Sequence, residues 1–411
     1  MSAIKPARTA GAPRTLVDDV PGRRRLGSIG RTALPPFVAF VAGWLVVASR
    51  VPGGWAAAFN PAKFDINDSG QYLKIARHGY QMSSQCGANL PKTTLPGKHL
   101  CGNVTWFAGY PALMRAFSVT GISVMTAGLI IGWLCWYLTL LMVWLLSAPE
   151  ARGVFATARR WACLLLAAVF PGQIYFAAIF PISLATFGML ACIYWSTRLP
   201  RRPAAFATGL AAGSAYLASV AVLPGLALTA VLTKLRRART AMCLAIAGVV
   251  AGVVAVLVYA QIAVGRWDAY FLTERIEYRV GLHNPLASIA KRFHQVWPIP
   301  HPGAGRTVAE QTILVAAILL LALICFAAAA WVEGPRGVPA SDVALIVAVV
   351  LTWVIPYIGG GALAVYRTEG LMIIAVPLLR RLPAVALAVL VLISTSIAWH
   401  MAPLFFHRVL T

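Results

Sequence analysis

One charge-rich stretch interrupts the apolar runs of this chain: FDINDSGQYLKIARHGY, residues 64–80. The spacing of its apolar residues predicts an amphipathic helix that begins near Asp68. We therefore expect a short helix that lies flat on a membrane surface. Its apolar and aromatic residues share one arc and its cations share the other: Tyr72, Leu73, Ile75 and Ala76 on the first arc, and Lys74, Arg77 and His78 on the second.

Both ends of this helix are marked in the sequence. Asn67 or Asp68 is a good N-cap, and an acid at that end is stabilised by the helix dipole. Gly79 suits the position after the last turn. If the first turn is regular, Asp68 shares the face of Tyr72 and Ile75, toward the bilayer, where a carboxylate indicates a functional site. The alternative is that Asp68 only caps the helix.

The composition defines the class of the protein. Hydrophobic residues make up 60% of the 411 residues, charged residues make up 11%, and the mean hydropathy is +0.77. These values are typical of an all-α polytopic membrane protein. The net charge of +23 would suggest nucleic-acid binding in a soluble protein, but the basic residues here cluster beside apolar runs. We expect membrane lipids as partners, and no nucleic acid.

Apolar runs of membrane-spanning length divide most of the chain. Residues 1–32 are polar and basic, and we expect a disordered cytoplasmic tail there. Residues 33–401 are predicted to form one transmembrane domain with outer loops at 50–118 and 264–310, followed by an outer tail at 402–411. The runs number about eleven, near residues 33–49, 120–147, 161–178, 180–197, 204–221, 222–233, 240–263, 311–332, 342–358, 362–379 and 384–401.

The charged residues predict the orientation of the chain. With the amino terminus inside, the short arginine and lysine clusters fall in inner loops, as the positive-inside rule requires. All seven histidines and seven of the twelve acids then fall on the outer side. Titratable groups gathered on one face indicate where chemistry takes place. We expect a multi-pass plasma-membrane protein with a cytoplasmic amino terminus and an extracytoplasmic site.

Two cysteines lie in the first outer loop, Cys86 and Cys101. An oxidising exterior favours a disulfide between them, which would contribute roughly 3 kcal/mol by loop entropy. Two free thiols are the alternative. No CxxC or His-x-His spacing indicates a metal site, and the other five cysteines lie in apolar runs, where a thiol acts as a small apolar residue.

A second aromatic segment, WFAGYPALMR at residues 106–115, follows the predicted surface helix. Alone, it is typical of an interfacial aromatic belt. Together, the two segments resemble the PIG-V-like mannosyltransferases, which are multispan glycosyltransferases of the GT-C class that use polyprenyl-phosphate sugars. The positions that match the family's opening motifs are Asp68, Ser69, Tyr72, Leu73, Ile75, Ala76, Gly79, Tyr80, Phe107, Tyr110, Pro111, Leu113 and Arg115.

Later segments are also similar to that family, and three positions depart from it. Weaker matches are Phe170-Pro171, FPISL at 180–184, GRWDAYF at 265–271, NPL at 284–286, and Tyr366-Arg367 followed by Pro377. Asn67 stands where the family usually has Trp, Gly109 replaces a Leu, and Pro181-Ile182 replaces Thr-Glu. These departures bear on the substrate more than on the reaction class.

The resemblance implies transfer of a mannosyl residue from polyprenyl-phosphate-mannose to a lipid- or glycan-linked acceptor, with inversion. Such a donor carries its own phosphate leaving group, so no nucleotide-binding fold is needed, and the sequence has no Walker loop. The reaction needs a carboxylate base and cations for the departing phosphate. No cofactor is implied, and metal dependence is left open. The candidates are Asp68 as the catalytic base with Asp65 in support, Arg367, His78, Arg275 and Arg279 for the donor phosphate, and Tyr72, Trp106, Tyr110 and Glu369 for the acceptor or sugar.

Two other functions remain open at this point. One is the same architecture acting on another polyprenyl-phosphate sugar, arabinose or glucose. The other is a transporter or lipid flippase, which would be expected to have paired charges within its spans and internal repeats. The spans here are almost free of charge at their centres, and we find no internal duplication.

The predicted topology can be tested by thiol labelling. A cysteine introduced at Ser83 or Ala304 should react with a membrane-impermeant reagent in intact cells, because both positions fall in outer loops. A cysteine at Ser28 should react only after the cells are opened. The opposite labelling pattern would reverse the orientation.

Overall fold

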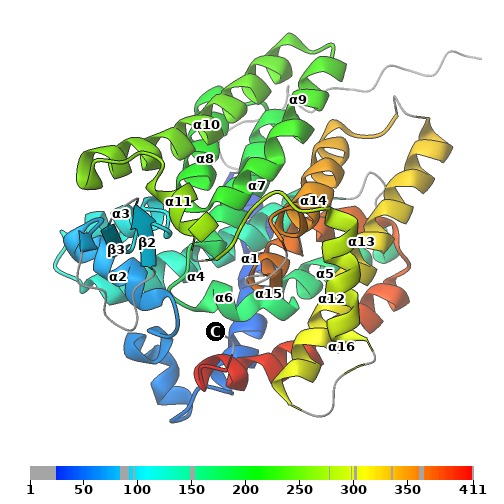
Figure 1. Ribbon diagram of the computed structural model, residues 1–411. Coiled ribbons are helices and arrows are strands. Elements are labelled where there is room, and N and C mark those ends of the chain that lie inside the picture. Colours follow the sequence, from blue (N-terminus) through cyan, green and yellow to red (C-terminus); the bar gives the residue numbers. More distant parts are fainter. Residues whose placement is uncertain are drawn as a thin grey trace, which may run out of the picture.

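The structure is a computed structural model that describes residues 25–83, 92–95, 98–148, 153–276, 278–297, 299, 303–334, 337–360 and 365–409. The described chain is mostly helical, as predicted, and includes one small sheet (Figure 1). In Figure 1, α2, α3 and the sheet lie together on one side of the molecule, and α12, α13 and α16 lie on the other side.

The first half of the chain contains one long helix, a polar loop with short elements, and then a set of buried helices. Its helices are α1 (Arg25–Ala48), η2 (Trp55–Phe59), η3 (Pro61–Phe64), α2 (Ser69–His78), α3 (Gly109–Ser118), α4 (Val124–Leu146), α5 (Val154–Ala168), η4 (Pro171–Gln173), α6 (Ile174–Ala177) and α7 (Ile182–Thr197).

The second half alternates long apolar helices with short ones. Its helices are α8 (Arg202–Ala215), η5 (Leu217–Ala221), α9 (Val222–Leu232), α10 (Arg236–Val264), α11 (Ala269–Ile276), α12 (Pro285–Val296), α13 (Ala304–Glu333), α14 (Ala340–Ile358), α15 (Val365–Gly370), η6 (Leu371–Arg381) and α16 (Ala384–Phe406).

The sheet lies in the polar loop directly after α2. It contains β1 (Met82–Ser83), β2 (Lys92–Leu95) and β3 (Lys98–Gly102) in the order β1-β3-β2. Both pairings are antiparallel, with Met82 opposite Gly102 and Lys92 opposite Cys101. No strand is predicted here from the residue pattern.

Five helices of the described chain are long and apolar enough to cross a membrane: α4, α10, α13, α14 and α16. A sixth span is obtained if α5 and the segment Pro171–Ala177, which are bent by 50° relative to each other, count as one. The fold is therefore that of a helical membrane protein with five or six such spans. The predicted number of eleven is not confirmed.

The excess in the predicted number has a physical cause. Prolines divide the apolar run between 161 and 197, because Pro171 begins a 3₁₀ turn and Pro181 immediately precedes α7. Most of the run near 362–379 forms the 3₁₀ helix η6, from Leu371 onward, which contains Pro377 and whose residues 371–379 are buried. These residues are apolar because other helices enclose them, and a count of apolar runs cannot distinguish that case from contact with lipid.

The predicted ends of the transmembrane domain also differ from the observed ones. Helix α1 begins at Arg25, so residues 25–32 of the predicted tail are helical, while residues 1–24 lie outside the described residues. Helix α16 continues to Phe406, five residues beyond the predicted end at 401.

Helices α8 and α10 pack with their backbones in close approach. Each carries a G-x-x-x-G sequence, GLAAG at 209–213 and GVVAG at 248–252. A Cβ atom added at Gly213 would lie 2.1 Å from the carbonyl oxygen of Val249. Small residues at such positions allow helices in a membrane to come into direct backbone contact. The two helices therefore form one rigid unit.

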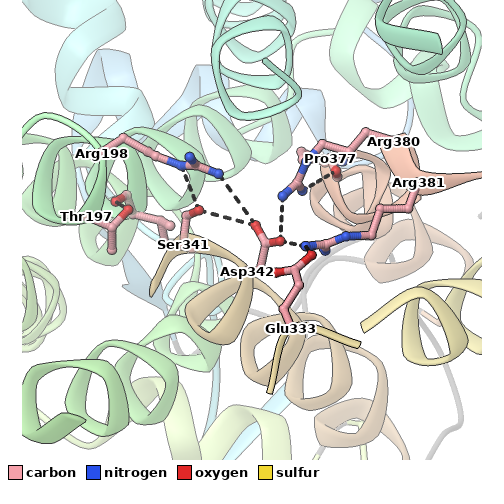
Figure 2. A network of polar contacts seen from close by, with 9 residues as sticks. Thr197, Arg198, Glu333, Ser341, Asp342, Pro377, Arg380 and Arg381 are labelled. Atoms are coloured by element: carbon pink, nitrogen blue, oxygen red, sulfur yellow. Dashed lines mark hydrogen bonds and ion pairs between the residues drawn. The ribbon is translucent and has the colours of Figure 1, made fainter. Parts of the chain in front are cut away.

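A buried ion cluster ties together four segments at the ends of α7, α13, α14 and η6 (Figure 2). The Asp342 side chain is 1% exposed and accepts hydrogen bonds from Arg380 at 2.6 Å and from Arg381 at 2.8 Å. A guanidinium nitrogen of Arg198 lies 3.8 Å from the other carboxylate oxygen. Arg381 also donates to Glu333 at 3.2 Å. The carboxylate of Asp342 is the centre of the cluster.

Replacing Asp342 with Ala should destabilise the protein strongly, since it leaves the arginines around it without their shared carboxylate. Loss of one partner from a buried ion pair costs about 3–5 kcal/mol. The measurement is the free energy of unfolding in detergent micelles. Asp268→Ala is the matched control, because it removes the acid of a surface pair with Arg266 and should have little effect. Equal losses in the two variants would contradict the role given to Asp342.

Candidate active site

Helix α2 has the amphipathic burial that the sequence predicts. Its apolar arc is buried and its cations Lys74, Arg77 and His78 are exposed. The turn before the helix is closed by Ser69, whose hydroxyl accepts a hydrogen bond from the Ile66 amide at 2.7 Å. Asn67 has a φ of +56°, in the left-handed region that Asn tolerates better than most residues. The left-handed backbone at this position accounts for Asn67, where the PIG-V-like family usually has Trp.

The end of α2 is held by groups from distant parts of the chain. The Gly79 amide donates to the Ile75 carbonyl at 2.8 Å, and a Cβ atom at Gly79 would lie 2.5 Å from the Tyr259 hydroxyl of α10. The Tyr259 hydroxyl also accepts a hydrogen bond from the Tyr80 amide at 3.3 Å. The Asn103 side chain donates to the Gly79 carbonyl at 3.3 Å. Helix α2 is therefore fixed against α10, which is long and apolar enough to cross a membrane.

Asp68 lies at the first turn of α2 and pairs with Arg367 of α15. Arg367 Nη1 donates to Asp68 Oδ2, and the two residues are 299 positions apart in the sequence. Asp68 occupies the N-cap position, but its side chain makes no capping hydrogen bond. The two side chains are 26% and 16% exposed, so the pair is partly open to a ligand. The side chain of Asp68 therefore does not cap the helix, as the alternative predicted, but pairs with Arg367 instead.

A break between two helices positions Arg367. The chain turns at Pro171–Gln173, and there Gly172 packs directly on the backbone of Gly370 at the end of α15. A Cβ atom at Gly172 would lie 2.4 Å from the Gly370 Cα, so only glycine fits without a shift. The guanidinium of Arg367 lies over the Phe180 ring, 6.0 Å from its centroid. Tyr72 contacts the same ring at 6.0 Å, so Phe180 is shared by both helices.

Further polar groups, which are not among the residues predicted from the sequence, surround the pair. Tyr216, between α8 and η5, has a side-chain hydrogen bond with Thr368 of α15. Burial raises the pKa of Tyr216 and of Tyr72, and in both cases the charges of Asp68 and Arg367 also act on the hydroxyl. Both phenols therefore stay neutral and can donate hydrogen bonds beside the pair. One sequence feature could have pointed to Tyr216, because it is a single tyrosine inside the apolar run at 204–221.

A second carboxyl group belongs to this site. Glu274 of α11 is half-buried, and burial raises its pKa to about 7. Its charge acts on Tyr216 and Tyr270, which places α11 next to the residues around Asp68. Tyr270 packs edge-to-face on Phe107, with 5.0 Å between ring centroids. Glu274 can therefore exchange a proton near neutral pH.

The aromatic residues proposed for a sugar pocket divide into two kinds. Tyr72 lies at the site, between Phe180 and Tyr110. Tyr110 is fully buried and its hydroxyl donates to the Gly128 carbonyl at 2.7 Å, so it supports Tyr72 from behind. Trp106 is 8% exposed, and its carbonyl accepts a hydrogen bond from Tyr80 at 2.8 Å. The charges of Asp68 and Arg367 act on the Tyr72 hydroxyl.

The remaining sequence candidates do not take part in the ion pair. His78, Arg275 and Arg279 have exposed side chains that form no hydrogen bond or ion pair with any other described residue. Asp65 is half-buried, with Oδ1 3.8 Å from the position that a Cβ atom at Gly70 would take, so it flanks the same first turn as Asp68.

Glu369 is brought into a different buried polar cluster. It is 2% exposed, its carboxyl group lies near Thr312 and Gln311 of α13, and burial raises its pKa to about 7. Arg292 of α12 donates to the Thr312 hydroxyl at 3.1 Å. Although Glu369 is only two residues from Arg367, this cluster joins α12, α13 and α15 and does not include Asp68.

The disulfide between Cys86 and Cys101 stays a prediction. Cys86 lies outside the described residues, and only the backbone of Cys101, in β3, is described. The five cysteines in apolar helices are free thiols. Within the described ranges, no three His, Cys, Asp or Glu side chains come together in a way that could hold a metal ion.

The fold and the helix lengths define the class of the protein as a helical membrane protein. Comparison with models of known protein families gives no match, and comparison with curated proteins gives none either. The resemblance to the PIG-V-like mannosyltransferases therefore depends on the sequence segments quoted above, chiefly those at residues 68–80 and 106–115.

The raised pKa of Glu274 predicts a pH dependence of stability. Its carboxyl group stays protonated in the folded protein up to about pH 7, whereas in the unfolded chain it ionises at its ordinary pKa near 4.5. Its contribution to stability is therefore fully present below about pH 4 and is lost as the pH rises toward 7. In Glu274→Gln this loss should be absent, so the variant should gain stability relative to wild type between pH 5 and 8.

The measurement is the unfolding free energy of both proteins in detergent across that pH range. Glu310→Gln, which removes an acid paired with Arg306 at the surface, is the control and should follow wild type. A Glu274→Gln curve parallel to wild type would show that Glu274 ionises normally.

Proposed function

We propose that this protein transfers a mannosyl residue from polyprenyl-phosphate-mannose to a lipid- or glycan-linked acceptor, with inversion at the anomeric carbon. The supporting observation is the partly open ion pair between Asp68 and Arg367 at the start of a surface helix. A base and a phosphate-binding cation are the two groups that such a transfer requires. The match of the α2 residues to the opening motif of the PIG-V-like family gives the sugar and the carrier.

The proposed reaction is a single displacement. Asp68 takes the proton of the acceptor hydroxyl while its oxygen forms a bond to the anomeric carbon. The bond from that carbon to the phosphate oxygen breaks, and its electron pair leaves with the polyprenyl phosphate. Arg367 stabilises the charge that develops on this phosphate. No cofactor takes part in this scheme.

Without donor, Arg367 is occupied by Asp68. A sugar phosphodiester carries one negative charge, so it competes with Asp68 for the guanidinium. When Arg367 turns to the phosphate, the Asp68 carboxylate is released to accept a proton. Donor binding would thus activate the base, and an acceptor that arrives alone would find the base still paired.

The other groups around the pair suit a sugar between donor and acceptor. Tyr72 and Tyr216 are neutral hydroxyl donors, and the buried Phe180 ring supports the Arg367 guanidinium. Glu274 adds a carboxyl group that can bind a sugar hydroxyl in either protonation state. In the topology predicted from the basic loops, this site faces the outer leaflet, and the donor lipid and membrane lipids are its partners.

Replacing Asp68 with Asn should abolish transfer while preserving donor binding. Asn keeps the size of the side chain but removes its basicity, so transfer should fall by about 100-fold or more. The assay uses purified protein in liposomes with radiolabelled polyprenyl-phosphate-mannose and a membrane lipid extract as acceptor. Asp65→Asn should lose less activity, and Asp268→Asn, at a surface pair, should match wild type. A fully active Asp68→Asn would refute the proposed base.

Arg367 should be required for donor binding rather than for proton transfer alone. Arg367→Ala should weaken binding of the labelled donor, and Arg367→Lys should restore it poorly because Lys lacks the bidentate geometry. Unchanged donor affinity and turnover in Arg367→Ala would make the residue a structural partner of Asp68 only.

The same liposomes separate the competing functions. Transfer from the arabinose or glucose donor in place of the mannose donor would keep the mechanism and change the sugar. Movement of intact lipid-linked sugar across the bilayer, with no cleavage of the sugar–phosphate bond, would identify a transporter.

A further inference from the structure

Helix α12 lies against the ends of two successive spans. Helices α13 and α14 are each long and apolar enough to cross a membrane, and a short connection joins them, so the start of α13 and the end of α14 lie at the same membrane surface. The amide of His283, just before α12, donates to the Ile358 carbonyl at the end of α14 at 2.9 Å. Figure 1 shows α12 beside both helices.

The contact of α12 with α13 lies at the level of the membrane surface. Arg292 of α12 donates to the Thr312 hydroxyl of α13 at 3.1 Å. Two residues before Thr312, Glu310 pairs with Arg306 at 2.8 Å, and no charged residue follows on α13 until Glu333. Because charged side chains are costly in the hydrocarbon region of a bilayer, Thr312 lies near the boundary of that region. Helix α12 is therefore at the depth of the lipid headgroups.

The local sequence fixes both ends of α12. The Asn284 side chain accepts a hydrogen bond from the Leu286 amide at 3.0 Å, and Pro285 occupies the first helical position. At the other end, the Trp297 amide donates to the Phe293 carbonyl at 2.8 Å. A helix held at both ends keeps its side chains at regular angles, about 100° apart for successive residues.

The side chains of α12 divide into three sectors around the helix axis, each about a third of the circumference. One sector packs on the protein, one is exposed and apolar, and one is exposed and polar. Their members are, in that order, Ile289, Arg292 and Val296; Leu286, Ala290, Phe293 and Trp297; and Lys291, His294 and Gln295. In the apolar sector, Leu286 is 74% exposed, Phe293 is 55% exposed and Trp297 is 59% exposed.

Three sectors match the three surroundings of a helix at the edge of a membrane protein, which are protein, hydrocarbon and water. Deeper along α13, Leu320 and Ile324 are exposed, as expected where a span faces lipid. Trp297 suits the boundary between hydrocarbon and headgroups, where Trp is enriched. Lys291 and His294 stand on the polar side, where a cation meets the lipid phosphates. A second protein chain on the apolar sector would not account for this charge pattern.

We propose that the apolar sector of α12 inserts into the boundary between the headgroups and the acyl chains of the bilayer. Leu286, Phe293 and Trp297 then contact acyl chains, and Lys291 and His294 face the lipid phosphates and water. Arg292, which turns inward to Thr312, holds the helix in this rotation. The proposal does not depend on glycosyl transfer.

Photo-crosslinking in liposomes tests the orientation of α12. The photoreactive amino acid p-benzoylphenylalanine is introduced at Ala290 or Phe293, in the apolar sector, and at Ala287 or Gln295, on the polar side. The liposomes contain phosphatidylcholine and phosphatidylglycerol with radiolabelled acyl chains. Attachment of labelled lipid should be about fivefold or more higher at the first two positions, because only these reach acyl chains. The probe at Leu320 of α13 is the positive control.

Equal lipid attachment at all four positions of α12 would overturn the proposal, and so would no attachment at Ala290 and Phe293 while Leu320 is labelled. A cross-linked dimer at Ala290 and Phe293 in place of the lipid adduct would show that a second copy covers the apolar sector, which also contradicts the proposal. Gel filtration verifies folding before reconstitution. If the probe prevents folding at one position, the other position of the same sector decides the test.

Discussion

The ion pair between Asp68 and Arg367 is the contact on which the rest of the site depends. It joins a surface helix near the start of the chain to a short helix near its end. Tyr259 and Asn103 hold α2 from one side, and the glycine contact between Gly172 and Gly370 holds α15 from the other. Because each helix is fixed independently, the carboxylate and the guanidinium pair at a smaller cost in side-chain conformational entropy than two surface side chains would.

The protein contains two carboxylate–arginine assemblies with different properties. Asp342 is 1% exposed and surrounded by arginines, so it has no room for a ligand and acts as a structural clamp. Among the described residues Asp68 pairs with one arginine, and it is 26% exposed, so an incoming phosphate can compete for that partner. The degree of enclosure, rather than the residue types, separates a stabilising cluster from a candidate site.

The sequence predicted those features that depend on local pattern. The burial of α2 and the five long apolar helices could be derived from periodicity and hydropathy. The roles of Asp68 and Arg367 stay predictions. The number of spans could not be derived, because buried helices such as η6 are as apolar as membrane-facing ones. Tyr216 and Glu274 lie near the site because of the tertiary packing of α8 and α11, whereas the side chain of Glu369 points toward α13 and away from the site. The direction of a side chain in the tertiary structure cannot be predicted from the local sequence pattern.

A double-mutant cycle measures the central contact directly. The free energy of unfolding is determined in detergent for wild type, Asp68→Asn, Arg367→Gln and the double variant. A direct pair predicts non-additive losses, with a coupling energy above about 0.5 kcal/mol, since the second substitution removes nothing that the first has not already broken. Strictly additive losses would show that Asp68 and Arg367 do not interact, and would contradict the account of the site.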